Sequence, residues 1–280
     1  MKTESNLNGD RSEPLLRVTG LCQKFVQRRA WSRAKFTVEA FQDVDLTLHA
    51  GKTLALVGES GAGKSSLARC VALLEPPSAG KIELEGSDLL GLGREKLFPL
   101  RRQIQMIFQD ATAALNPALT AGEIIAEPLA IQGVGTKAQR RKRALHLMEQ
   151  VGLDPKGEKK RPFEFSGGQR QRLAIARGLA LEPRVLILDE VLSNLDAMNQ
   201  SMILRLLADL QRSHGLAYLH VSHELRLVAE FADEVAVMCE GRIVEQQGVQ
   251  ELFESPKHSY TRALLATVQS VDSILLERSA

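Results

Sequence analysis

A glycine-rich stretch that ends in a lysine and two serines is the first place where this sequence could bind phosphate. It comprises Gly58, Glu59, Ser60, Gly61, Ala62, Gly63, Lys64, Ser65 and Ser66. Glycines allow consecutive backbone N–H groups to point at phosphate oxygens, and the start of a helix adds a favourable field. In this pattern Lys64 reaches the β- and γ-phosphates, and the Ser65 hydroxyl ligates Mg²⁺. The apolar run before it and the helical pattern after it favour a phosphate loop over a ligand-free turn.

Two adjacent acids, Asp189 and Glu190, end the apolar run 185–188. Such a run is typical of a central strand, and ligands bind at the carboxyl edge of parallel sheets. Asp189 can therefore hold Mg²⁺. Glu190 points elsewhere and is placed to deprotonate or orient water for attack on a γ-phosphate.

Two further polar residues are expected at the same sheet edge. His223 follows the apolar run 217–221 and could contact the γ-phosphate, and Gln109 follows the run 104–108. The Gln109 amide could sense Mg²⁺ or the attacking water. His220 lies three residues before His223, but strand geometry turns the two rings to different faces, which argues against a metal site there.

A second place able to bind phosphate lies in the middle of the chain, at Ser166, Gly167, Gly168 and Gln169. Ser166 suits the N-cap of a helix whose apolar side chains recur with helical spacing, so free N–H groups would gather there. One nucleotide cannot occupy both this place and the phosphate loop of the same chain. A flexible loop before a helix is the alternative.

The elements that must position these side chains alternate along the chain. Patterns typical of strands lie at residues 44–48, 53–57, 82–84, 104–108, 185–189, 217–221 and 235–237. Helical patterns lie at 64–74, 123–131, 138–151 and 169–180, and at an amphipathic stretch with Met202, Ile203, Leu206, Leu207 and Leu210. Strands alternating with helices predict an α/β fold with a parallel sheet covered on both faces. The stretch from residue 111 to about 161 departs from this pattern and is interpreted as a helical insert.

Composition is that of a globular protein with 280 residues, of which 44% are hydrophobic. A net charge of +2 does not indicate nucleic-acid binding. Three widely spaced cysteines form no metal or disulfide pattern, which fits a reducing compartment. Residues 1–13 are polar and are interpreted as a loose tail, residues 27–35 as an exposed hairpin, and no apolar run is long enough to span a membrane.

Taken together, the motifs resemble those of the ATP-binding subunits of ABC transporters. The phosphate loop, Gln109, Ser166–Gln169, the strand ending at Asp189-Glu190, Ser193-Asn194-Leu195-Asp196 and His223 follow one another in that family's order. The resemblance covers roughly residues 14–250. It implies a P-loop NTPase (RecA-like) core with a parallel sheet, an N-terminal antiparallel β subdomain and a helical insert at about 111–168. Residues 251–280 would form a C-terminal helical extension.

By the same resemblance, two such subunits dimerise head to tail around ATP and Mg²⁺. Ser166–Gln169 and Asp196 of one subunit would close over the ATP held by the other, and an upstream aromatic residue would stack on adenine. Phe25 and Phe36 are both candidates, and Phe25 is favoured. The implied partners are a second ATPase subunit, identical or merely similar, two membrane permease subunits and, indirectly, a solute-binding protein. The expected location is the cytoplasmic face of the bacterial inner membrane.

A narrower resemblance concerns the peptide/nickel importer branch, and it rests on four segments. They are Arg101–Asp110, Asn116-Pro117, Glu127–Leu129 and Pro256–Leu265. Departures are Val191-Leu192 in place of Pro-Thr, Asn194 in place of Ala, and Phe165 in place of Leu. No cysteine follows Cys239, so no iron–sulfur cluster is expected. Both peptides and nickel remain open as cargo.

Two other function classes fit less well. A soluble cassette protein of translation would carry two cassettes, and one of DNA repair would carry long coiled coils before Ser166. A catalytically inactive regulatory cassette would not need Lys64, Asp189, Glu190 and His223 together. The sequence therefore predicts an ATPase that powers import.

Overall fold

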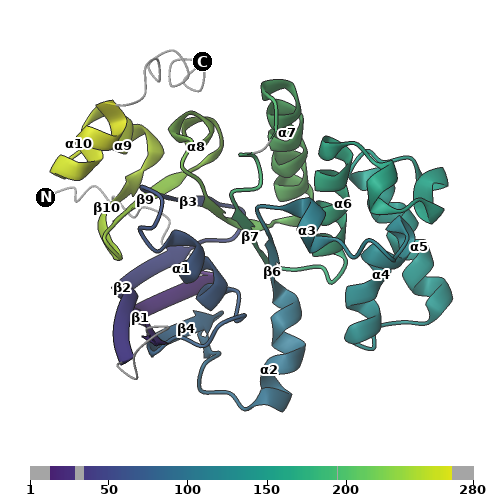
Figure 1. Cartoon of the computed structure of the whole chain (residues 1–280), viewed down its shortest axis with the longest axis horizontal. Helices are drawn as coiled ribbons and strands as arrows, with labels where there is room; N and C mark the ends of the chain where they lie inside the picture. Colours follow the sequence, from purple (N-terminus) through teal and green to yellow (C-terminus); the bar gives the residue numbers. More distant parts are fainter. Residues whose placement is uncertain (1–12, 29–34, 194, 267–280) are drawn as a thin grey trace, which may run out of the picture.

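The computed structural model describes residues 13–28, 35–193 and 195–266, and a six-stranded sheet forms its centre (Figure 1). Its order is β10-β9-β3-β8-β7-β6, and all neighbours are parallel except β9 and β10. The strands are β3 (Thr53–Val57), β6 (Ile104–Ile107), β7 (Val185–Asp189), β8 (Ala217–Val221), β9 (Glu234–Cys239) and β10 (Arg242–Gly248). The expected parallel sheet is confirmed, and β3, β7 and β8 have the predicted bounds.

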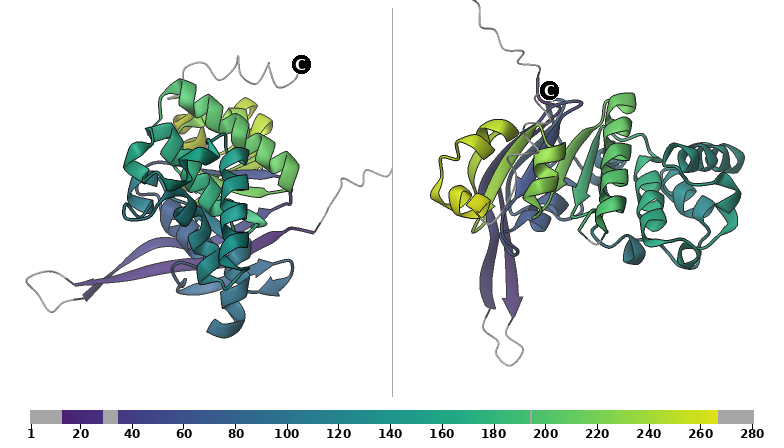
Figure 2. Two further views of the ribbon diagram at one scale, coloured as in Figure 1. Left: turned by 90° about the vertical axis from the view of Figure 1, so that its right-hand side faces the viewer. Right: turned by 90° about the horizontal axis from the view of Figure 1, so that it is seen from above.

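A second, antiparallel sheet has the order β2-β1-β4-β5. Its strands are β1 (Leu16–Arg28), β2 (Lys35–Leu48), β4 (Ala79–Leu84) and β5 (Ser87–Asp88). The long strands β1 and β2 pair from Leu16 opposite Leu48 to Arg28 opposite Lys35, and they project away from the other elements (Figure 2). This pairing agrees with a hairpin near residues 27–35, although residues 29–34 lie outside the described part. The N-terminal antiparallel β subdomain is confirmed.

Helix α1 (Lys64–Val71) packs between the two sheets. Its Leu67 and Val71 are fully buried in one apolar cluster that also contains Leu56 of β3 and Phe41 of β2. The sequence predicted a helix as far as residue 74, but α1 ends at Val71. Leu73 has a φ of 59°, in the left-handed region that stops a helix.

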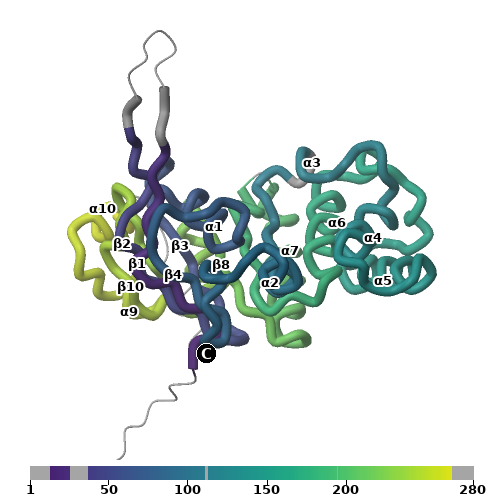
Figure 3. The backbone as a smooth tube through the Cα atoms, turned by 90° about the horizontal axis from the view of Figure 1, so that it is seen from below, coloured from purple at the N-terminus to yellow at the C-terminus, as the bar shows by residue number. Residues whose placement is uncertain are grey.

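The helical insert lies on one side of the central sheet, where Figures 1 and 3 show it as a separate layer of helices. It contains α3 (Ala111–Ala114), α4 (Ala121–Ile131) and α5 (Lys137–Gln150), and it leads into α6 (Gly167–Leu179). Capping boxes explain the starts of α4 and α5. Thr120 and Glu123 exchange side-chain-to-backbone hydrogen bonds, and so do Thr136 and Gln139.

The remaining helices cover the sheet and its edges. They are α2 (Arg94–Leu100), α7 (Ala197–His214), α8 (Leu225–Phe231), α9 (Val249–Glu254) and α10 (Ser259–Ala266). On α7 the predicted apolar face is buried at Ile203, Leu207 and Leu210, whereas Met202 is 45% exposed. Within the described ranges, none of the helices combines the length and the apolar character needed to cross a membrane.

Candidate functional site

The phosphate loop joins β3 to α1 in a conformation that requires glycine at two positions. Gly58 has a φ of 148°, and a Cβ atom there would lie 2.1 Å from the Met238 carbonyl oxygen. Gly63 has a φ of 102°, and its Cβ would lie 2.3 Å from the Ala40 carbonyl oxygen. A side chain at either position would clash with these carbonyl oxygens of β9 and β2. Only glycine therefore fits at positions 58 and 63 of the loop.

Lys64 is held inside this loop. Its Nζ donates hydrogen bonds to the carbonyl oxygens of Gly58 at 2.7 Å and of Glu59 at 2.8 Å. Lys64 is 4% exposed, and burial lowers the pKa of its ammonium group, although Glu190 and Asp189 act in the opposite direction. A buried cation whose hydrogen bonds go to neutral carbonyl oxygens is well suited to a phosphate ligand.

Ser65 and Asp189 meet at the carboxyl edge of the sheet. The Ser65 hydroxyl donates to Asp189 Oδ1 at 2.9 Å. Asp189 is 4% exposed, and burial raises the pKa of its carboxyl group while the Ser65 hydrogen bond opposes that rise. A hydroxyl and a carboxylate at the phosphate loop are the hard oxygen donors that Mg²⁺ prefers, so these two residues fit the expected metal.

Glu190 lies one residue further on, in a tight turn after β7. Its φ is 49°, its N–H donates to the Val221 carbonyl at 3.0 Å, and its carbonyl accepts the Ser193 hydroxyl at 2.9 Å. Gln109 Nε2 donates to Glu190 Oε2 at 2.8 Å, and His223 Nδ1 lies 3.2 Å from Oε1. Three predicted residues from three strand ends therefore converge. Gln109 bonds Glu190 here; its expected role at the metal stays a prediction.

The structure keeps Ser166, Gly167, Gly168 and Gln169 away from the phosphate loop. Ser166 caps α6 as predicted: its hydroxyl accepts the Gln169 N–H at 3.3 Å, and Gln169 Oε1 accepts the Ser166 N–H at 2.9 Å. Ser166, Gly167 and Gln169 are exposed. Figures 1 and 3 show α6 beside the insert and α1 beneath the central sheet, in different parts of the molecule.

Asp196 caps α7, and Asn199 of the same helix lies close to Gly168 of α6. Asn199 donates to Asp196 from its backbone N–H at 2.9 Å and from Nδ2 at 2.6 Å, and these bonds lower the pKa of the Asp196 carboxyl group. A Cβ atom at Gly168 would lie 2.6 Å from Asn199 Oδ1. Asn199 was not among the predicted site residues, and its only signal in the sequence is its place one helical turn after Asp196. Asn194 lies outside the described residues.

Phe25 is half-buried on β1, opposite Val38 of β2. Ala40, two positions after Val38, carries the carbonyl that abuts Gly63 of the phosphate loop. Phe25 therefore belongs to the strand pair that borders the loop, and its role in stacking on adenine stays a prediction. The side chain of Phe36 lies outside the described part.

Tyr260 of α10 contacts the phosphate loop, although it was not among the predicted site residues. The Glu59 N–H donates to the Tyr260 hydroxyl at 3.0 Å. Tyr260 belongs to the segment 256–265 that resembles the importer branch, but no local pattern links that segment to a loop so far away in the chain.

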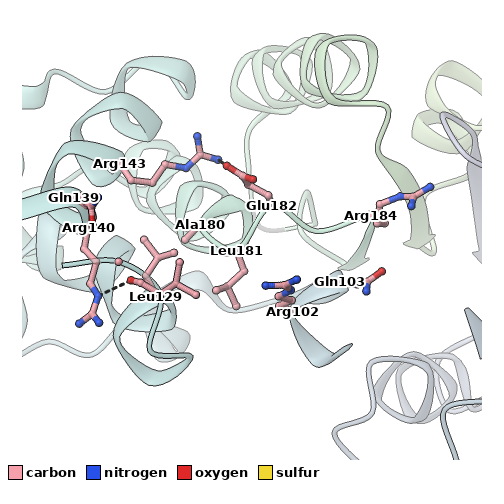
Figure 4. A pocket seen from close by; sticks show the side chains of 12 residues that line it. Arg102, Gln103, Leu129, Gln139, Arg140, Arg143, Ala180, Leu181, Glu182 and Arg184 are labelled. Carbon is pink, nitrogen blue, oxygen red and sulfur yellow. Dashed lines mark hydrogen bonds and ion pairs between the residues drawn. The ribbon is translucent and has the colours of Figure 1, made fainter. Parts of the chain in front are cut away.

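A cavity of about 560 Å³ lies between the insert and the start of β6 and β7 (Figure 4). It is lined by four arginines, Arg102, Arg140, Arg143 and Arg184, and by apolar residues that include Leu129 and Leu181. Arg143 pairs with Glu182 at 3.0 Å. None of the predicted site residues lines this cavity, and it lies at the sheet edge opposite Asp189, so it is not part of the phosphate site.

Comparisons with known proteins agree with this geometry. Residues 41–193 match the family model described as ABC transporter. The chain is 44% identical over 262 residues to the probable peptide ABC transporter ATP-binding protein y4tS of Sinorhizobium fredii, covering 93% of this chain and 74% of the relative. It is 46% identical over 261 residues to the glutathione import ATP-binding protein GsiA of Salmonella paratyphi A, covering 93% of this chain but only 42% of that longer protein.

Among solved structures, the fold is similar to the dimeric post-hydrolysis state of the ATP-binding cassette MJ0796 bound to ADP and Pi. The TM-score is 0.72 at 26% sequence identity, with 84% of this chain and 98% of that chain covered.

Proposed function

The chain belongs to the ABC transporter family, and we propose that it is the subunit of a peptide importer that binds and hydrolyses ATP to drive transport. The observation that carries this proposal is the convergence of Lys64, the Ser65–Asp189 pair and the Glu190 carboxylate at one sheet edge. Such a convergence supplies a phosphate ligand, a metal site and a base together. The names of similar proteins, which include peptide and glutathione import, support peptides as cargo. Nickel stays a prediction.

Hydrolysis requires a water molecule to attack the γ-phosphate of ATP, and Glu190 is the proposed base. Gln109, which follows β6, and His223, which follows β8, each contact one oxygen of the Glu190 carboxylate. Because β6 and β8 flank β7, these contacts come from both sides and fix the orientation of the carboxylate before substrate arrives. Lys64 leaves the carbonyls of its own loop to bind the β- and γ-phosphates. Because the backbone glycines are already in place, the loop needs little rearrangement to accept the phosphates.

Ser65 and Asp189 are the residues that we propose for Mg²⁺. When bound there, the ion neutralises charge that develops on the phosphate oxygens. The Ser65 hydroxyl and the Asp189 carboxylate supply oxygen ligands, and the hydrogen bond between them keeps both oriented in its absence.

Replacing Asp189 by asparagine tests this assignment. The amide can still accept the Ser65 hydrogen bond, but it lacks the negative charge, so the rate of ATP hydrolysis should fall by at least about 100-fold. Mg²⁺ should no longer strengthen binding of a fluorescent ATP analogue, measured with and without EDTA. Asp209→Asn, at an exposed position of α7, is the matched control and should behave as wild type. Wild-type hydrolysis in Asp189→Asn would exclude Asp189 from metal binding.

A head-to-tail dimer explains why Ser166–Gln169 faces solvent. We propose that these residues complete the ATP site of a second ATPase subunit, with Asp196 and Asn199 beside them at the contact. The N–H groups of Gly167 and Gly168, which the Ser166–Gln169 capping box does not use, would then bind the γ-phosphate. A dimeric neighbour, the MJ0796 cassette, supports this arrangement.

A groove between the core and the insert is the proposed contact with the permease. It has a volume of about 260 Å³ and is lined mostly by apolar residues from several elements, including Leu74, Phe108, Leu115 and Ile131. Leu74 is 54% exposed and Ile131 is 64% exposed, which leaves apolar surface uncovered at the groove. The groove adjoins Gln109, so a permease segment bound in it could move Gln109 relative to Glu190. Such docking would hold the chain at the cytoplasmic face of the inner membrane.

Introducing a charge at Ile131 tests this contact. Ile131→Glu should reduce co-purification with the permease by at least about tenfold, because a carboxylate would lose its water on docking. ATP hydrolysis by the isolated chain should stay unchanged. Phe163→Glu is the matched control, since Phe163 is 68% exposed on the insert but does not line the groove. Equal loss in both variants would place the permease elsewhere.

A further inference from the structure

The C-terminal extension reaches the phosphate loop through one side chain. Tyr260 of α10 accepts a hydrogen bond from the Glu59 N–H at 3.0 Å, and its ring packs against the apolar cluster that contains Val57 and Val237. Val57 is the last residue of β3, directly before the loop. Tyr260 therefore bonds the loop itself and packs against the apolar cluster to which the strand before the loop contributes.

The peptide group bonded by Tyr260 is the one that also holds Lys64. Its N–H belongs to Glu59 and bonds Tyr260, while its carbonyl belongs to Gly58 and accepts the Lys64 ammonium at 2.7 Å. One peptide plane is thus fixed at both ends. Gly58, with a φ of 148° and no Cβ, would otherwise allow this plane to rotate easily.

Tyr260 is itself held in place by Glu245 of β10. Glu245 is 8% exposed, and its carboxylate accepts the N–H groups of Lys257 at 2.7 Å and of His258 at 3.0 Å. These bonds fix the turn that enters α10. His258 Nδ1 in turn lies 3.2 Å from the Tyr260 N. A continuous set of contacts therefore runs from the central sheet through the extension to the loop.

From these contacts we infer that Tyr260 is a positioning residue for ATP binding, which orients the Gly58–Glu59 peptide so that the loop and Lys64 are ready for phosphate. This gives the segment 256–265 a role in the nucleotide site of its own chain. The inference rests on the proposed ATP site. It does not make Tyr260 a catalytic residue, because its hydroxyl contacts the backbone.

Tyr260→Phe removes the hydroxyl and keeps the ring. This variant should bind a fluorescent ATP analogue with Mg²⁺ more weakly, with a dissociation constant about 3- to 10-fold higher than that of wild type. Its KM for ATP should rise by the same factor, which corresponds to the free energy of one hydrogen bond. The kcat should stay within about twofold, because Glu190 and its partners are unchanged. A purely structural role for Tyr260 would lower the thermal unfolding midpoint without this split between KM and kcat.

Tyr218→Phe is the matched control, because Tyr218 and Tyr260 are the two tyrosines of the chain and the substitution is the same. The Tyr218 hydroxyl also donates one hydrogen bond to a backbone group, the Leu207 carbonyl at 2.8 Å, but far from the loop. This variant should unfold at a lower temperature and bind the ATP analogue as wild type does.

Glu245→Gln provides an independent test of the chain of contacts. An amide in place of the carboxylate should release the turn at Lys257 and weaken ATP binding. The double variant with Tyr260→Phe should bind ATP little more weakly than the weaker-binding of the two single variants. The inference would be overturned if Tyr260→Phe bound ATP with unchanged affinity. It would also be overturned if the double variant weakened ATP binding by the product of the two single effects. Failure of the wild-type chain to bind the analogue would instead contradict the proposed function.

Discussion

Glu190→Gln should lower the steady-state rate of ATP hydrolysis by about 10²- to 10⁴-fold, the usual contribution of a positioned base. Glutamine keeps the size of the side chain and can still bond Gln109, but it cannot take a proton from water. ATP binding should persist, because Lys64, Ser65 and Asp189 are untouched. The variant should therefore accumulate as an ATP-bound dimer, measurable by size-exclusion chromatography with light scattering.

Glu149→Gln controls for the loss of one negative charge. Glu149 is exposed on α5, a helix of the insert that carries none of the proposed ATP-site residues. This variant should therefore hydrolyse ATP at the wild-type rate. If Glu190→Gln turned over ATP like wild type, Glu190 would not be the base. If it failed to bind ATP, the carboxylate would instead be needed for the loop itself.

Ser166→Arg should abolish ATP-dependent dimerisation and reduce hydrolysis by at least about 100-fold, while the isolated chain binds ATP with nearly wild-type affinity. Ser166 is exposed, and Figure 1 shows α6 and α1 in different parts of the fold, so we expect an arginine at Ser166 to leave the phosphate loop of its own chain free. In the proposed dimer the same side chain would occupy the space of the ATP held by the other subunit. Sedimentation with ATP, in the Glu190→Gln background, measures the effect.

Two variants separate bulk at the interface from loss of the helix cap. Ser166→Ala removes the hydroxyl that caps α6 without adding bulk; it should cost about 1 kcal/mol of stability and still permit dimers. Ser213→Arg adds the same bulk at an exposed position near the end of α7 and should dimerise normally. ATP-dependent dimers of Ser166→Arg would refute the shared site.

Local patterns predicted the elements that carry the phosphate chemistry. The bounds of β3, β7 and β8 agree with the apolar runs in the sequence, because central parallel strands are buried on both faces. Ser166 was identified as a helix cap for a similar reason: a capping box is formed by residues three positions apart. The helix starts at Ala121 and Lys137 were predicted within two residues. The end of α1 was not, since a turn at Leu73 stops it early.

Contacts between distant segments could not be predicted in this way. The sequence placed Gln109, Glu190 and His223 at one edge, but not the two contacts that hold the Glu190 carboxylate. Nothing local to α2 or to Tyr260 indicated how they pack. Such contacts depend on strand order and on how loops cross the sheet, which are properties of the whole chain.

The sequence alone predicted the groups that we propose for the chemistry of this protein: a phosphate loop, a metal carboxylate, a base and a second anion site, each encoded within a few consecutive residues. Their backbone conformations depend on glycine, on helix caps and on strand ends, which are local causes. Only the tertiary structure decided which of them meet. The sheet order brings Ser65 to Asp189 and Gln109 to Glu190, and it leaves Ser166 exposed, as the proposed dimer requires. It also brings Tyr260 to the phosphate loop, because packing against the core, and not sequence proximity, decides where α10 lies.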